Sequence, residues 1–128
     1  RLINLIITRN FSNNMISIYH NPRCSKSRQA LALLEASDVP LNIILYLDTP
    51  PSFEDLEGIL RKLGITAREL LRKTESAYKE NNLSDNTKTE SELIETMVSY
   101  PKLIERPIIT NGNKAVIGRP PEIVLEII

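Results

Sequence analysis

The single cysteine of the chain, Cys24, is the side chain best suited to chemistry because of its neighbours in the sequence. It lies within residues 19–28 (YHNPRCSKSR), between an expected strand end and an expected helix start. Backbone N–H groups and the dipole at a helix N-terminus stabilise negative charge, so they favour a thiolate and can hold an oxyanion. Arg23, Lys26 and Arg28 add positive charge, and such surroundings lower a cysteine pKa from about 8.5 to roughly 3.5–7.5. We therefore predict a reactive thiol here rather than a buried, inert cysteine.

This thiol has no partner cysteine within the chain. Ser27 occupies the position that the second cysteine takes in a C-x-x-C redox pair, so an oxidised or adduct form of Cys24 must be resolved by an outside thiol. One cysteine cannot form an internal disulfide, which excludes a disulfide-stapled secreted scaffold and favours the reducing cytoplasm. One histidine and one cysteine cannot build a structural zinc site, so no bound metal is expected.

The residues around Cys24 predict a β-α-β unit of about 30 residues. A short apolar strand ends at His20, a helix covers residues 24–36, and residues 42–47 (NIILYL) are typical of a second, buried strand. Such a unit favours a right-handed parallel connection, with the cysteine at the turn from strand to helix.

A helical middle follows this unit. Ser52 is a candidate N-cap for a helix that ends at Gly64, and the apolar residues between them follow the i, i+3, i+4, i+7 spacing. Two capping-box signatures predict further helices, one over residues 66–72 and one that begins at Thr89. Residues 75–86 between these helices are polar and predicted to be rich in loops.

The C-terminal part predicts a β-hairpin and a final helix. Residues 107–110 and 114–117 flank Asn111-Gly112, a strong hairpin signal, and Pro120-Pro121 suits the first turn of a helix. The resulting order is β-α-β, helices, β-β-α. A thioredoxin-like α/β fold has this order, with a mixed four-stranded sheet and flanking helices.

Length and composition fit one globular domain. The chain has 128 residues, 41% of them apolar, and 17 Leu and 17 Ile supply an aliphatic core. We expect a single domain over residues 15–128, preceded by a weakly ordered extension over residues 1–14. Sixteen basic and sixteen acidic residues cancel, which argues against a nucleic-acid or membrane-surface binder. No apolar run reaches the roughly 20 residues that span a bilayer. We expect the protein to be a monomer in the cytoplasm.

Residues 19–28 resemble the active-site motif of the glutaredoxin-linked arsenate reductase family, whose pattern begins Y-H-N-P-x-C. The resemblance extends over residues 15–128 and is carried by four further segments. These are residues 44–51 (ILYLDTPP), 70–73 (LLRK), 103–108 (LIERPI) and 118–122 (GRPPE). Arg23 and Ser25-Lys26 differ from the small residues of the best-known members and are more similar to an arsenate-reductase-like branch with an R-C-S-K-S-R segment.

The resemblance implies a role for each of several residues. Cys24 would be the nucleophile, and three arginines that grip the oxyanion fall on Arg72, Arg106 and Arg119. His20, four residues before the nucleophile, would favour the thiolate. A guanidinium is always charged and presents a planar fork of donors, which suits a tetrahedral oxyanion. The resemblance also implies that the peptide bond between Arg106 and the proline that follows it is cis.

The resulting hypothesis is reduction of arsenate to arsenite through a covalent thio-arsenic adduct on Cys24. By the resemblance, glutathione would be the co-substrate, glutaredoxin would clear the mixed disulfide, and no metal or organic cofactor would be bound. One alternative is a thiol-dependent regulatory protein that binds RNA polymerase, although such regulators commonly carry the C-x-x-C switch that Ser27 removes. Another is an oxidoreductase with a different oxyanion or thiol substrate.

Overall fold

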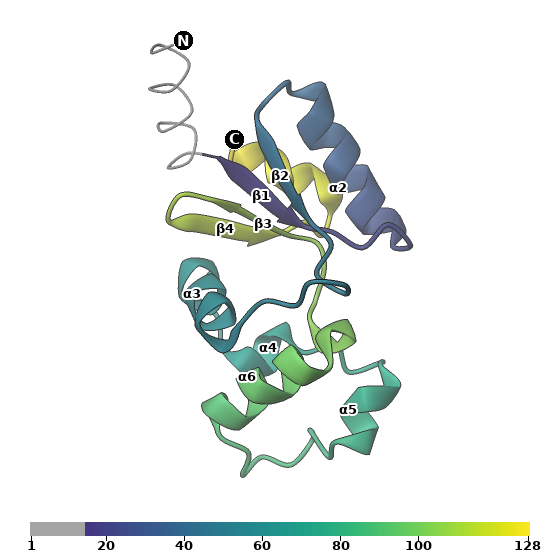
Figure 1. Cartoon of the computed structure of the whole chain (residues 1–128), viewed down its shortest axis with the longest axis vertical. Coiled ribbons are helices and arrows are strands. Elements are labelled where there is room, and N and C mark those ends of the chain that lie inside the picture. The colour runs from purple at the N-terminus through teal and green to yellow at the C-terminus, as the bar shows by residue number, and fades with distance from the viewer. Residues whose placement is uncertain (1–14) are drawn as a thin grey trace.

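The computed structural model of the chain describes residues 15–128, and the predicted extension over residues 1–14 lies outside the described residues (Figure 1). In the described part, four strands form one sheet in the order β2-β1-β3-β4. The strands are β1 (Ile16–Tyr19), β2 (Leu41–Ile44), β3 (Ile108–Asn111) and β4 (Lys114–Ile117). β1 pairs in parallel with β2 and antiparallel with β3, and β3 pairs antiparallel with β4. The predicted mixed four-stranded sheet is therefore confirmed.

Helices cover both faces of this sheet (Figure 1). On one face, α2 (Ser25–Ala36) packs against the terminal 3-10 helix η2 (Pro121–Glu126). On the other face, α3 (Phe53–Leu63) packs against β4. The remaining helices are α4 (Ala67–Leu70), α5 (Ser76–Glu80), α6 (Glu90–Ser99) and the 3-10 helix η1 (Pro101–Leu103). No helix within residues 15–128 is long and apolar enough to cross a membrane.

Two apolar clusters hold these layers together. Successive strand residues point to opposite faces of a sheet. Ile18 and Ile109, which are opposite each other in the β1–β3 ladder, therefore join Leu34 of α2 and Val124 of η2 in one cluster. Ile108, the neighbour of Ile109, joins the buried residues of α3, α4 and α6 in the other cluster. The sheet thus fixes the position of α2, which begins directly after Cys24.

Local sequence signals set the ends of the middle helices, as predicted. Ser52, Thr66 and Thr89 each cap a helix, because each side chain accepts a hydrogen bond from the backbone N–H three residues later. In all three cases the acidic side chain at that later position accepts the N–H of the cap in return. Gly64 ends α3 in the left-handed conformation with φ of 70°, which glycine adopts without strain.

The second strand is shorter and more exposed than predicted. The sequence predicts a buried strand over residues 42–47, but β2 ends at Ile44 and is the edge strand of the sheet. Ile43 is 44% exposed because β2 is bonded on one side only, to β1. The following residues turn away from the sheet, and Tyr46 is buried in the cluster around α3 and α6. A short apolar run does not by itself distinguish a buried strand from an apolar turn.

Other boundaries also differ from the prediction. The helix predicted over residues 66–72 ends two residues early, because Leu71 takes extended backbone and forms a bridge with Ile104. Residues 75–86, predicted to be rich in loops, contain the short helix α5. The hairpin turn falls on residues 112–113, one residue later than predicted, where the glycine has a φ of 63°.

Gly118 follows β4 where the backbone runs close to β3. A Cβ atom here would lie 2.8 Å from Pro107 Cγ and 3.2 Å from Ile109 Cδ1, which is closer than ordinary van der Waals contact. We expect Gly118→Ala to lower the free energy of unfolding by about 1–3 kcal/mol, as overpacking does, measured by urea denaturation followed by circular dichroism. Gly58→Ala in α3 is the matched control, because the nearest atom outside its own helix backbone is Arg61 Nη2 at 3.9 Å. It should raise stability by about 1 kcal/mol or less. Unchanged stability of Gly118→Ala would contradict the close approach.

Candidate active site

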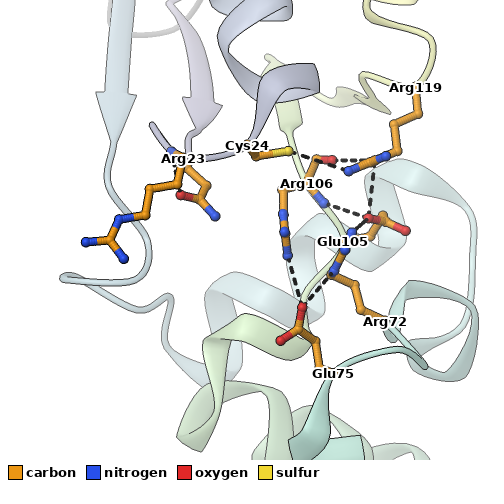
Figure 2. Close-up of polar contacts among 8 residues, drawn as sticks. Arg23, Cys24, Arg72, Glu75, Glu105, Arg106 and Arg119 are labelled. Carbon is orange, nitrogen blue, oxygen red and sulfur yellow. Dashed lines mark hydrogen bonds and ion pairs between the residues drawn. The ribbon is translucent and has the colours of Figure 1, made fainter.

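Cys24 lies at the N-terminus of α2, directly after the turn that follows β1 (Figure 2). The residue is only 9% exposed. Burial by itself would raise the pKa of the thiol, but the backbone N–H groups of Ser27 and Lys26 and the Arg106 guanidinium stabilise the thiolate. Together these groups hold the pKa of Cys24 below its ordinary value. The predicted helix-start position is confirmed, and its electrostatics favour an ionised sulfur.

Two of the predicted arginines, Arg106 and Arg119, lie beside this sulfur. Arg119 Nη2 is 3.6 Å from Cys24 Sγ, and Arg106 interacts with the same sulfur. Both stand before a proline: the Arg106–Pro107 bond is cis, as the resemblance implied, and so is the Arg119–Pro120 bond. Arg119 Nε donates a hydrogen bond to the Arg106 carbonyl oxygen at 2.7 Å. The two loops therefore brace each other next to α2.

The third predicted arginine, Arg72, reaches the cluster from the segment after α4. Its backbone N–H donates to the Leu103 carbonyl at 2.8 Å, which ties this segment to η1. Its guanidinium forms ion pairs with Glu105 and with Glu75. In Figure 2 the Arg72 side chain points toward the other two arginines, and it contacts them through these carboxylates.

Two glutamates that the sequence analysis missed hold the three arginines together (Figure 2). Glu105 Oε1 pairs with Arg72 and lies 3.3 Å from Arg119 Nε. Glu75 Oε2 lies 3.4 Å from Arg72 Nε and 3.6 Å from Arg106 Nη1. One signal was available, since Glu105 directly precedes Arg106 in the LIERPI segment. Nothing in the sequence places Glu75 opposite Arg106, because that contact depends on how the start of α5 lies against the segment between η1 and β3.

His20 contacts the first turn of α2 through Ser27. The residue is 5% exposed, and its Nδ1 is 2.7 Å from Ser27 Oγ, which also accepts the Asn21 N–H at 3.0 Å. Burial and the charge of Arg28 lower the pKa of His20, so its ring is neutral at neutral pH. Any influence of this ring on Cys24 therefore passes through Ser27 and the turn.

The remaining cations of the motif do not converge on the sulfur. Arg28 donates from Nη1 to a carbonyl within the same turn at 2.9 Å, and Arg23 is exposed with its guanidinium pointing away from Cys24 (Figure 2). Arg23 instead joins Lys102 and Arg106 in the lining of a cavity of about 230 Å³. Its lining also includes Glu75 of the arginine cluster, and positive side chains outnumber negative ones in it.

Two buried polar atoms near the cluster have no hydrogen-bond partner among the described residues, Tyr46 Oη and Arg106 Nε. Burial raises the pKa of Tyr46 to about 12, so its hydroxyl stays protonated. Both atoms are therefore donors without an acceptor, which is rare in protein interiors. An anion bound at the cluster would supply acceptors where Arg106 Nε now has none.

The arrangement can hold a tetrahedral anion beside a nucleophilic sulfur. Guanidinium groups bind such anions through charge-assisted hydrogen bonds, and a thiolate attacks an electrophilic centre held close to it. Within residues 15–128, no three His, Cys, Asp or Glu side chains come together in a way that could hold a metal ion. The residues present at the site are a thiol with a lowered pKa and fixed cations.

Known proteins share this sequence and architecture. An uncharacterized protein of Escherichia coli K12, YfgD, is 53% identical over 114 residues, which cover 88% of this chain and 96% of that protein. An arsenate reductase of Haemophilus influenzae is 47% identical over 114 residues, which cover 88% of this chain and 98% of that protein. The solved structure of an arsenate reductase from Vibrio cholerae has a TM-score of 0.86 at 46% identity, covering 90% of this chain and 98% of that one.

The model of one family, described as the ArsC family, matches residues 19–127. The match begins before the cysteine turn and includes all three arginines. It confirms the family resemblance that the sequence motifs indicated. Because the match spans nearly all of the described residues and the relatives agree over the same region, the chain belongs to the ArsC family.

Proposed function

We propose that this protein reduces arsenate to arsenite, with Cys24 as the nucleophile. The observation that carries the proposal is the convergence on one sulfur of a helix N-terminus and two arginines, with Arg119 Nη2 at 3.6 Å. Relatives at 47% and 46% identity that are named arsenate reductases support arsenate as the substrate. Arg72, Arg106 and Arg119 would hold the oxyanion and spread its charge.

In the first step, the Cys24 thiolate attacks the arsenic atom. An As–S bond forms, and an As–O bond breaks as that oxygen takes up protons and leaves as water. Arsenic remains pentavalent, so this step is a substitution without electron transfer. Arg119 and Arg106 would stabilise the negative charge first on the sulfur, beside which they lie, and then on the oxygens of an arsenate attacked by that sulfur.

The second stage needs thiols from outside the chain, because Cys24 is the only cysteine. Glutathione would displace a second oxygen as water and form a second As–S bond. A glutaredoxin thiolate would then attack the glutathione sulfur, so that the electron pair of that As–S bond stays on arsenic. This step reduces arsenic to the trivalent state and oxidises the two thiols to a mixed disulfide. Water then releases arsenite from Cys24. Because the reaction needs glutathione, we propose that the protein acts in the cytoplasm.

His20 and Ser27 would act as positioning residues in this reaction. Ser27 Oγ contacts both the His20 ring and the Asn21 N–H, so it joins the strand end to the first turn of α2. The same residue presents its backbone N–H to the Cys24 sulfur. Because the His20 ring is neutral, it supports the thiolate by holding this turn and contributes no charge of its own.

An oxidoreductase with a different oxyanion or thiol substrate is the second candidate. The observation that favours it is the pairing of Glu75 and Glu105 with the arginines, since these carboxylates compete with any anion. A relative at 53% identity, YfgD, is uncharacterized. Turnover measured with arsenate against other acceptors distinguishes the two candidates.

Cys24→Ser should abolish arsenate reduction, because an alcohol at this position is not ionised at neutral pH. The measurement is oxidation of NADPH in the presence of glutathione, glutaredoxin and glutathione reductase, with arsenate, phosphate or no anion. We expect arsenate-dependent NADPH consumption by the wild type and only background consumption by the variant. Full turnover by Cys24→Ser would exclude the covalent mechanism, and no arsenate-dependent turnover by the wild type would exclude arsenate as the substrate.

Arg106→Ala should lower kcat/KM for arsenate by about 10- to 100-fold, as expected for loss of charge-assisted hydrogen bonds. The side chain is mostly buried beside Cys24, so the lost contacts are made in a site with little solvent screening. Arg61→Ala is the matched control, because Arg61 is exposed on α3 and pairs only weakly with Glu57 at 3.8 Å. It should retain wild-type kcat/KM. Equal effects of both substitutions would contradict a specific role for Arg106.

The lowered pKa of Cys24 can be measured directly from the pH dependence of alkylation by iodoacetamide, a neutral reagent that reacts with the thiolate. The midpoint should lie below the value of about 8.5 for a free cysteine, so the thiol remains reactive as the pH falls to that midpoint. Arg106→Gln removes a cation that stabilises the thiolate and should move the midpoint upward. A wild-type midpoint at or above the ordinary value would contradict a stabilised thiolate.

A further inference from the structure

We propose that Glu105 is a specificity-determining residue, because its carboxylate occupies the place among the three arginines that an oxyanion oxygen would take. This inference rests on the proposed function in one respect: both concern the same anion site. Glu105 then acts as a built-in competitor, and it sets how tightly the site binds an anion and how strongly it favours one anion charge over another.

The contacts of a single oxygen carry the argument. Glu105 Oε1 accepts a hydrogen bond from Arg72 Nη1 and lies 3.3 Å from Arg119 Nε. The same oxygen accepts the backbone N–H of Arg106 at 3.2 Å. Donors from all three arginines therefore meet at one carboxylate oxygen (Figure 2). A tetrahedral anion that used these arginines would place an oxygen in the same position.

The second carboxylate extends this competition. Glu75 Oε2 lies 3.4 Å from Arg72 Nε and 3.6 Å from Arg106 Nη1. Three guanidinium groups are thus opposed by two carboxylates, and ionisation of the Cys24 thiol would balance the remaining positive charge. A dianion entering this group meets a nearly balanced set of charges, so its affinity depends on how far the carboxylates withdraw.

The site nevertheless has a donor next to the sulfur, because Arg119 Nη2 lies 3.6 Å from Cys24 Sγ. An anion that binds first to this donor lies next to the nucleophile. Arg106 Nε, which is buried without a partner among the described residues, becomes available once the carboxylates withdraw. The Glu105 side chain is 27% exposed, so it can move toward solvent as the anion takes its place.

The direction in which one substitution changes the anion affinity distinguishes this role from a purely structural one. If Glu105 merely held the arginines in place, its loss would loosen the cluster and weaken anion binding. If Glu105 competes with the anion, removal of its charge strengthens anion binding. Glu105→Gln is suited to the test, because the amide keeps the shape of the side chain and one acceptor oxygen while losing the charge.

The experiment measures binding of sulfate and of perchlorate by calorimetry at constant ionic strength. Both anions are tetrahedral, and they differ in carrying two charges and one charge. In Glu105→Gln we expect the Kd for sulfate to fall about tenfold and that for perchlorate about threefold, because the Coulomb energy is proportional to the ligand charge. Glu57→Gln is the matched control, since the Glu57 side chain is half-exposed on α3 and pairs with Arg61 rather than with an arginine of the cluster, and its Kd values should equal those of the wild type.

Unchanged or weaker sulfate binding by Glu105→Gln would overturn the inference, as would equal gains for the two anions or no binding by either protein. Circular dichroism checks that the variant is folded. If it is not, Glu75→Gln decides in its place, because it removes the other competing charge and should also tighten sulfate binding. The proposed function fails separately: a wild type that turns over no arsenate, while Glu105→Gln still binds sulfate more tightly, refutes arsenate reduction and leaves this inference standing.

Discussion

The site depends on keeping three guanidinium groups close together, two of them beside the Cys24 sulfur. Like charges at such distances repel, and mostly buried side chains have little water to screen them. The structure offsets this repulsion with Glu75, whose carboxylate lies between Arg72 and Arg106, and with Glu105, whose carboxylate joins Arg72 to Arg119. The arginines are therefore held in place before any ligand arrives, which is the condition for electrostatic stabilisation of a reacting anion.

The fold meets this condition by bringing distant segments to one end of the sheet. Cys24 and Arg119 are 95 positions apart in the sequence, yet their side chains are in contact. The β1–β3 ladder places the loop that carries Arg106 next to the start of α2, and the hairpin returns Arg119 to the same point. The close approach of Gly118 to Pro107 then lets the two loops meet without an intervening side chain.

Features set by neighbouring residues could be predicted from the sequence. The caps at Ser52 and Thr89 and the cysteine at the start of α2 are local, and the structure has them. Features set by distant segments could not. Burial along β2 depends on its place at the sheet edge, and the contacts of Glu75 depend on how the start of α5 lies against the segment between η1 and β3. His20 illustrates the same limit, because only the folded turn shows that its ring bonds to Ser27.

The Cys24 sulfur and a bound oxyanion would contact the same two arginines, so anion binding would change the nucleophilicity of the sulfur. In the free protein the Arg106 guanidinium lowers the pKa of Cys24, and Arg119 Nη2 contacts the same sulfur. A thiolate with a lower pKa also has a lower intrinsic nucleophilicity. A bound oxyanion would take part of their positive charge, so the sulfur would become more nucleophilic at the moment when its target is in place. The His20 ring is neutral, so it has no positive charge to share between the sulfur and the oxyanion. The backbone N–H groups of Ser27 and Lys26 also lower the pKa of Cys24, and because these groups do not titrate, their effect on the sulfur does not depend on a bound anion.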